Sequence, residues 1–183
     1  EIFARGENNV DVSGVVREII ENVKENGDKA LKFYLEKFDK VSLDELEVSD
    51  AEIEEAFASV DPELINIIKT AADNIYDFHK RQVKNSFIIS ENEGVITGQK
   101  VTPIEKVGLY VPGGTAAYPS TVLMDSIPAK IAGCKEVVMV TPPQSNGKVN
   151  PVILAAAKIA GVDKIFKVGG AQAIAALAYG TES

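Results

Sequence analysis

The first forty residues repeat apolar side chains at the spacing of an α-helix. Two such stretches meet near Asn26-Gly27, and their apolar positions are Val12, Val15, Val16, Ile19, Ile20 and Val23, then Ala30, Leu31, Tyr34, Leu35 and Phe38. A recurrence every three or four residues places these side chains on one face of a helix. Because glycine ends helices easily and Asp28 can cap a new one, we expect two amphipathic helices here.

Two capping signals predict further helices downstream. Ser49 followed by Glu52 matches a capping box, and Asp61-Pro62 places a cap before a proline at the first helical position. We expect the longest helix after the second signal, fading around 81–84, with an apolar face of Leu64, Ile65, Ile67, Ile68, Ala71, Ala72, Ile75 and Phe78. The β-rich runs 86–90 and 95–101, which flank Glu91-Asn92-Glu93-Gly94, then predict a β-hairpin.

The pattern changes from Lys106 onward. Short β-rich runs at 107–111, 137–141 and 165–168 alternate with helical stretches, as parallel strands with crossover helices require. The repeated joints 129–133 and 157–161 each end a helix at a glycine before a strand, which is a common feature of doubly wound sheets. We therefore expect an α/β fold, with N-terminal helices and the hairpin in residues 1–101 and an α/β region in residues 102–183.

Composition and charge narrow the function classes. The 183 residues include 27 acidic and 19 basic side chains, with a formal net charge of -8. Such an acidic chain disfavours nucleic-acid and anionic-membrane partners. Its apolar runs are too short to span a bilayer, and its single cysteine excludes an internal disulfide, so we expect a cytoplasmic protein.

The average charge hides two unlike halves. Up to Glu93 there are 22 acidic and 11 basic residues, whereas from Gly94 onward there are 5 acidic and 8 basic residues. Only 3 of the 14 glycines precede Gly94. The glycine-rich, mildly basic second half is therefore the part that we expect to face an anionic ligand.

The turns that follow the predicted strands are the candidate binding sites, because ligands of open parallel sheets bind at the carboxyl ends of strands. Tyr110 precedes the turn Pro112-Gly113-Gly114, where glycine allows close backbone approach to a ligand. The alternative is that Tyr110 is an ordinary strand aromatic. Gly169-Gly170 precedes a helix that carries Gln172 in its first turn, where free N–H groups favour an anion such as a pyrophosphate.

Other conspicuous residues have simpler explanations. Thr141-Pro142-Pro143 carries no reactive group, and we interpret it as structural. We interpret Cys134 as a buried small hydrophobe and His79 as a surface or packing residue without a second histidine to share a metal. The acidic series is interpreted as a solvated helical face: Asp44, Glu45, Glu47, Asp50, Glu52, Glu54 and Glu55.

Four motifs, read in order, carry a family resemblance. They are Lys106 to Gly114 (KVGLYVPGG), Tyr118 to Met124 (YPSTVLM), Ile127 to Cys134 (IPAKIAGC) and Val168 to Ser183 (VGGAQAIAALAYGTES). Their sequence and spacing closely resemble histidinol dehydrogenases, densely over 102–183 and more loosely through the N-terminal helices. The resemblance implies an incomplete Rossmann-like, mainly parallel sheet of the aldehyde-dehydrogenase-like kind.

The resemblance also implies an activity and site residues. Members of the family are homodimeric, zinc-dependent enzymes that oxidise L-histidinol to L-histidine through the aldehyde and reduce NAD⁺. By position in the motifs, Tyr110 and Gln172 contact NAD, and Ser120 lies near the substrate. Both cofactor residues are also the strand-end candidates.

One departure from the family pattern is large. The family's zinc ligands and its Glu-His acid/base pair have no counterpart here, and the chain holds one histidine. We therefore expect the N-terminal portion of such an enzyme, catalytically inactive by itself, with the zinc ligands outside this sequence. The alternative is a non-catalytic ligand-binding or assembly module of the same fold.

Overall fold

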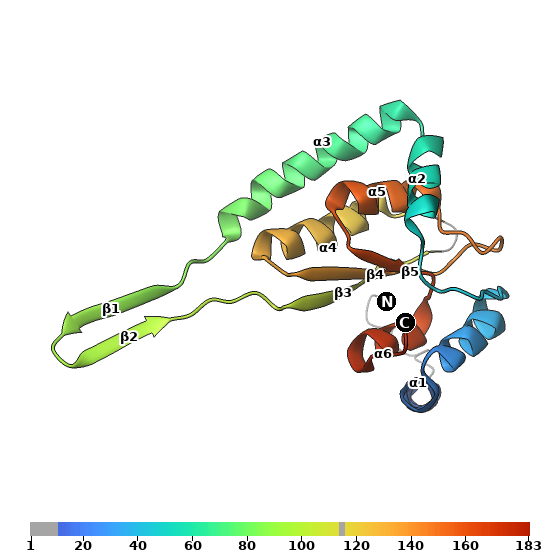
Figure 1. The fold of residues 1–183 in the computed structure, drawn as a ribbon, viewed down its shortest axis with the longest axis horizontal. Coiled ribbons are helices and arrows are strands. Elements are labelled where there is room, and N and C mark those ends of the chain that lie inside the picture. Colours follow the sequence, from blue (N-terminus) through green and yellow to red (C-terminus); the bar gives the residue numbers. More distant parts are fainter. Residues whose placement is uncertain (1–10, 114–115) are drawn as a thin grey trace, which may run out of the picture.

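The computed structural model describes residues 11–113 and 116–183. Its centre is a parallel sheet of β3 (Lys106–Tyr110), β4 (Glu136–Val140) and β5 (Lys164–Phe166), in the order β3-β4-β5 (Figure 1). The register places Val107 opposite Val137 and Met139 opposite Ile165. This confirms the predicted α/β fold, with each strand beginning one residue earlier than the sequence pattern indicates.

Two helical layers cover one face of the sheet. α4 (Pro119–Ala132) and α5 (Pro151–Ala160) lie directly on it, and α2 (Asp50–Ser59) and α3 (Pro62–His79) pack on α4 and α5 (Figure 1). Because α5 is enclosed on both sides, its residues Ala155, Ala156 and Ala157 are fully buried. Small side chains there let the two helical layers approach each other closely.

The opposite face of the sheet is covered by α1 (Ser13–Tyr34) and α6 (Gly170–Tyr179) (Figure 1). Their shared core includes Leu31 and Tyr34 from α1, Ala173 from α6 and Val140 from the sheet. Helices before residue 101 therefore pack into the same cores as the sheet that follows. The division of the chain at 101/102 stays a prediction.

The helix boundaries confirm the signals in the sequence. Ser49 and Glu52 form the predicted capping box, and the Asp61 side chain accepts a hydrogen bond from the Glu63 N–H. α4 and α5 end at left-handed glycines. Gly27 breaks α1 with a φ of 51° and a ψ of -129°, and the Glu182 carboxylate accepts from the Asp28 N–H at 2.8 Å, which ties the end of the chain to this break.

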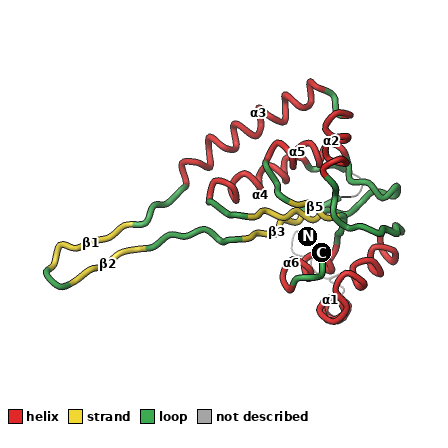
Figure 2. Tube along the Cα trace, in the orientation of Figure 1, coloured by secondary structure: helices red, strands yellow, loops and turns green. Residues whose placement is uncertain are grey.

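The predicted hairpin extends away from the layered body. β1 (Phe87–Asn92) and β2 (Val95–Gln99) pair antiparallel, and Figures 1 and 2 show them far from the sheet. A 3-10 turn, η3 (Lys80–Gln82), joins α3 to the hairpin, and η2 (Leu35–Asp39) is a π-helical extension of α1. Every residue from 81 to 106 is exposed. No helix within the described ranges is long and apolar enough to cross a membrane.

The acidic series is exposed as expected at most of its positions, but Asp44, Glu45 and Glu47 precede α2 and do not lie on a helical face. On α2 itself, Glu54 pairs with Lys158 at 2.5 Å and Glu55 with Lys148 at 3.1 Å. These ion pairs join the acidic first half of the chain to the basic second half. Both pairs are exposed, so each contributes little to stability. In each pair the acid comes from the first half of the chain and the base from the second half.

The segments that follow β3, β4 and β5 meet at Pro142, which lies in the segment after β4. Ideal Cβ atoms on Gly113 and Gly169 would each lie 2.7 Å from atoms of the Pro142 ring. The glycine of the first predicted turn therefore faces a proline rather than open space for a ligand. Gly114, its neighbour in the same motif, lies outside the described residues.

Gly169→Ala should destabilise the chain, because the added methyl group meets a rigid proline ring. We expect the free energy of unfolding to fall by about 1–3 kcal/mol, the usual effect of overpacking. Denaturant titration measures this change. The matched control is Gly14→Ala in α1, where nothing lies within 4 Å of the new Cβ and stability should not fall. An unchanged midpoint for Gly169→Ala would show that the proline contact is easily relieved.

Candidate cofactor-binding turn

The arrangement of helices marks the carboxyl end of β3 as the binding edge. α4 and α5 cover one face of the sheet, whereas α6, which follows β5, covers the other (Figure 1). α6 starts at the carboxyl end of β5, and the carboxyl ends of the three parallel strands meet at the same edge of the sheet. Ligands of open α/β sheets bind outside the carboxyl ends of the strands, and Tyr110 is the last residue of β3.

The Tyr110 side chain joins the two candidate turns. Its hydroxyl oxygen accepts a hydrogen bond from the Gly170 N–H at 3.2 Å, although the residues are 60 positions apart. Its half-buried ring packs against the core that α1 and α6 share. Tyr110 therefore packs as an ordinary strand aromatic and also fixes the start of α6. A tyrosine that accepts this bond keeps its own hydroxyl proton available for donation.

The N-terminus of α6 has unsatisfied donors. Gly170 has a φ of 69°, a left-handed conformation that glycine adopts without strain, and this turns the chain from β5 into α6. Its N-cap residue, Gly169, has no side chain that could accept from the first amides of the helix. Tyr110 takes the Gly170 N–H, so the next amides, of Ala171 and Gln172, carry the partial positive charge of the helix end.

The Gln172 side chain lies beneath this turn. The residue is 2% exposed, and in the described part of the chain its Oε1 atom has no hydrogen-bond partner. That oxygen lies 2.7 Å from the position of an ideal Cβ on Gly170, so the amide is folded against the turn. A buried amide oxygen without a partner is unfavourable, and a donor from a bound group would satisfy it.

Ser120 occupies a different place from the two cofactor candidates. It is exposed in the first turn of α4, which begins at Pro119, directly after the N-cap residue Tyr118. No hydrogen bond among the described residues joins Ser120 to Tyr110 or Gly170. The structure therefore brings Tyr110 and Gln172 to one turn and leaves Ser120 on the helix surface.

The remaining candidates do not assemble into a reactive centre. His79 is half-buried, and its Nδ1 lies 2.7 Å from Gln82 Oε1. Cys134 is partly exposed after α4, which corrects the expectation that it is buried. Within residues 11–113 and 116–183, no group of three or more His, Cys, Asp and Glu side chains could hold a metal ion. The residues described here therefore do not fit a zinc site.

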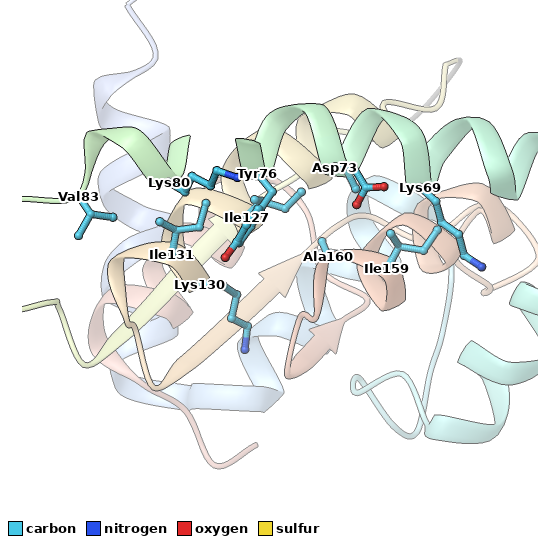
Figure 3. A pocket seen from close by; sticks show the side chains of 11 residues that line it. Lys69, Asp73, Tyr76, Lys80, Val83, Ile127, Lys130, Ile131, Ile159 and Ala160 are labelled. Atoms are coloured by element: carbon cyan, nitrogen blue, oxygen red, sulfur yellow. The ribbon is translucent and has the colours of Figure 1, made fainter. Parts of the chain in front are cut away.

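The cavities do not coincide with the candidate turn. At the strand exits, a hollow of about 20 Å³ is lined by Pro112, Gly113 and Thr141 among others. A larger cavity of about 590 Å³ lies between α3, α4 and α5, where Figure 3 shows Tyr76, Lys80 and Lys130. Lys130 pairs with Asp163 at 2.6 Å and Lys80 with Asp77 at 2.6 Å. Because these charges are neutralised inside the chain, we favour the strand-end turn as the ligand site.

The sequence analysis did not identify the partly buried ion pair between Lys167 and Glu52, which lies next to this turn. Lys167 is 6% exposed, and its Nζ lies 3.1 Å from Glu52 Oε1. Burial raises the pKa of Glu52, but hydrogen bonds from the Ser49 N–H and from Lys167 outweigh it and bring the pKa below its usual value. The available signal was a lysine inside the apolar run Ile165 to Val168. The pair holds α2 against the residue that precedes Val168-Gly169-Gly170.

Comparisons with known proteins agree with the geometry. The family model described as histidinol dehydrogenase matches residues 4–183. Among curated relatives, the histidinol dehydrogenase of Streptococcus mutans is 58% identical over 175 residues, covering 96% of this chain and 40% of that protein. The Clostridium acetobutylicum histidinol dehydrogenase is 54% identical over 179 residues, covering 98% of this chain and 42% of its own length.

A solved structure supports the same assignment. The crystal structure of histidinol dehydrogenase from Elizabethkingia anophelis matches with a TM-score of 0.91 and 45% identity, covering 96% of this chain and 41% of that one. The chain thus spans about two fifths of the length of the relatives it matches. Sequence motifs, fold and relatives agree, and the chain belongs to the histidinol dehydrogenase family.

Proposed function

We propose that the turn of Tyr110, Gly170 and Gln172 forms part of the NAD site of an enzyme that oxidises L-histidinol to L-histidine through the aldehyde. One observation supports this most strongly. The Tyr110 hydroxyl accepts from the Gly170 N–H at the N-terminus of α6, at the carboxyl edge of the sheet where dinucleotides bind in α/β folds. Membership of the histidinol dehydrogenase family supplies the reaction.

The backbone of α6 would bind the anionic part of the cofactor. The N–H groups of Ala171 and Gln172 and the helix dipole favour negative charge, and a pyrophosphate carries it. NAD⁺ supplies the hydride acceptor when bound. The protein's part is to hold the helix end in a fixed place, which the bond between Tyr110 and Gly170 does.

Two side-chain groups complete this partial site. Gln172 Oε1 has no partner in the described chain and would accept a hydrogen bond from a cofactor hydroxyl or carboxamide. The Tyr110 hydroxyl would donate its remaining proton to the same ligand. An acceptor and a donor at one helix end fix the orientation of a bound molecule as well as its affinity.

The other parts of the proposed enzyme rest on the resemblance. Zinc and the acid/base groups require ligands beyond those described here, so we derive no chemical step through them. Ser120, exposed on α4, is proposed to lie near L-histidinol. A cytoplasmic homodimer is the proposed working form.

Tyr110→Phe tests the turn, because it removes the hydroxyl while keeping the ring. In the enzyme that contains this segment, we expect the KM for NAD⁺ to rise about 2- to 13-fold, the equivalent of one hydrogen bond. Gln172→Ala should act in the same direction. Zinc content should not change, and Tyr118→Phe, a 43% exposed tyrosine, is the control. Loss of zinc in either variant would contradict a cofactor role.

The 183-residue chain itself should be inactive. Hydride transfer from an alcohol needs a base and a polarising group near the substrate, and the described residues contain no cluster that could hold a metal. With histidinol and NAD⁺, the purified chain should produce no NADH above a protein-free control, measured by absorbance. Turnover by the chain alone would overturn this proposal.

A further inference from the structure

Lys167 carries a positive charge into the interior of the protein. Among residues 11–113 and 116–183 it is the only charged residue that is buried, with 6% of its surface exposed. Ile165, two positions earlier, belongs to the core that α4 and α5 form with the sheet. A buried ammonium group is unfavourable unless it is paired, and an apolar side chain of similar volume is often at least as stable in such a place. A lysine here therefore calls for a reason other than stability.

The Glu52 carboxylate joins Lys167 to the start of α2. Lys167 Nζ donates to Glu52 Oε1 at 3.1 Å and to Oε2 at 3.2 Å. The same Oε2 accepts from the Ser49 N–H at 3.1 Å, which is one half of the capping box of α2. One carboxylate therefore fixes both the beginning of α2 and the lysine that follows β5.

Backbone hydrogen bonds hold the residues around Lys167 to the segment before α2. The Lys167 N–H donates to the Leu46 carbonyl at 2.7 Å, and the Val48 N–H donates to the Ile165 carbonyl at 2.8 Å. Segment 46–48 leads directly into the capping box. The exit of β5 is thus tied to α2 by its backbone and by the side chain of Lys167.

The two glycines that follow have no side chains that could fix their own position. Gly170 adopts a φ of 69°, and its N–H is held by the Tyr110 hydroxyl at 3.2 Å. Lys167 is the nearest side chain before the glycines with a fixed polar partner. The turn is therefore anchored at both of its ends, by Lys167 before it and by Tyr110 at Gly170.

We propose that Lys167 is a positioning residue for NAD⁺. Its ammonium group binds Glu52 rather than a ligand, and it acts through the backbone of the glycine turn. A turn that is already fixed loses less conformational entropy when its amides, of Ala171 and Gln172, bind a pyrophosphate. The inference rests on the proposed function, because it takes this turn as part of the NAD site. Loss of the ion pair should therefore weaken the binding of NAD⁺ and leave the binding of L-histidinol unchanged.

Two substitutions test the pair in the enzyme that contains this segment. Lys167→Met removes the ammonium group and nearly keeps the volume, whereas Glu52→Gln removes the charge and keeps an oxygen for the capping box. In each variant the Kd for NAD⁺, measured by isothermal titration calorimetry, should rise about 3- to 10-fold. The KM for L-histidinol and the zinc content should not change. Lys167→Arg, which can still donate to both carboxylate oxygens, should keep the Kd within about twofold.

The double variant and two matched controls isolate the pair. Because both substitutions break one interaction, Lys167→Met/Glu52→Gln should bind NAD⁺ no more weakly than the weaker single variant. Lys158→Met and Glu54→Gln break the exposed pair that joins the same helix α2 to α5, and they should leave the Kd unchanged. If Lys167→Met does not fold, Glu52→Gln decides the question by the same measurement.

The outcomes separate this inference from the proposed function. A lower denaturant midpoint with an unchanged Kd in Lys167→Met and Glu52→Gln would show a merely structural pair and overturn the inference. If Tyr110→Phe and Gln172→Ala nevertheless raise the Kd, the proposed NAD site stands without it. If none of the four substitutions raises the Kd, the NAD site lies elsewhere, and the inference and the proposed function of the turn fail together.

Discussion

The packing of Pro142 between Gly113 and Gly169 determines how closely the three strand exits approach one another. The rigid Pro142 ring lies between these two glycines. Because neither glycine carries a side chain, the end of β3 and the start of α6 lie close together. At this separation the Tyr110 hydroxyl accepts from the Gly170 N–H, at 3.2 Å. The candidate site thus depends on a contact that itself includes no chemically reactive group.

The layers on the two faces of the sheet hold this arrangement in place. α6 lies against α1 on one face, and the Glu182 carboxylate binds the Asp28 N–H where Gly27 breaks α1. On the other face, the pair of buried Lys167 with half-buried Glu52 holds α2 beside the residue that leads into the glycine turn. Breaking a buried pair leaves an uncompensated charge, so this contact resists displacement more than the exposed pairs of α2 do.

The same chain contains one region with little internal support. The hairpin shares no core with the layered body, and its apolar residues face water on both sides. Contiguous apolar side chains that face water mark a surface that packs against other residues.

The sequence by itself determined the elements and the residues that mark the cofactor turn. Helical periodicity, the Ser49–Glu52 box and the glycines after α4 and α5 report local backbone energetics, which act within a few residues. Tyr110 and Gln172 could be chosen because strand ends are binding edges and because the motifs resemble a family. Only the tertiary structure decided that Tyr110 contacts Gly170, that Gly113 and Gly169 face Pro142, that Lys167 pairs with Glu52, and that the hairpin stands apart. These contacts join residues tens of positions apart, and their energies depend on packing distances that no local pattern encodes.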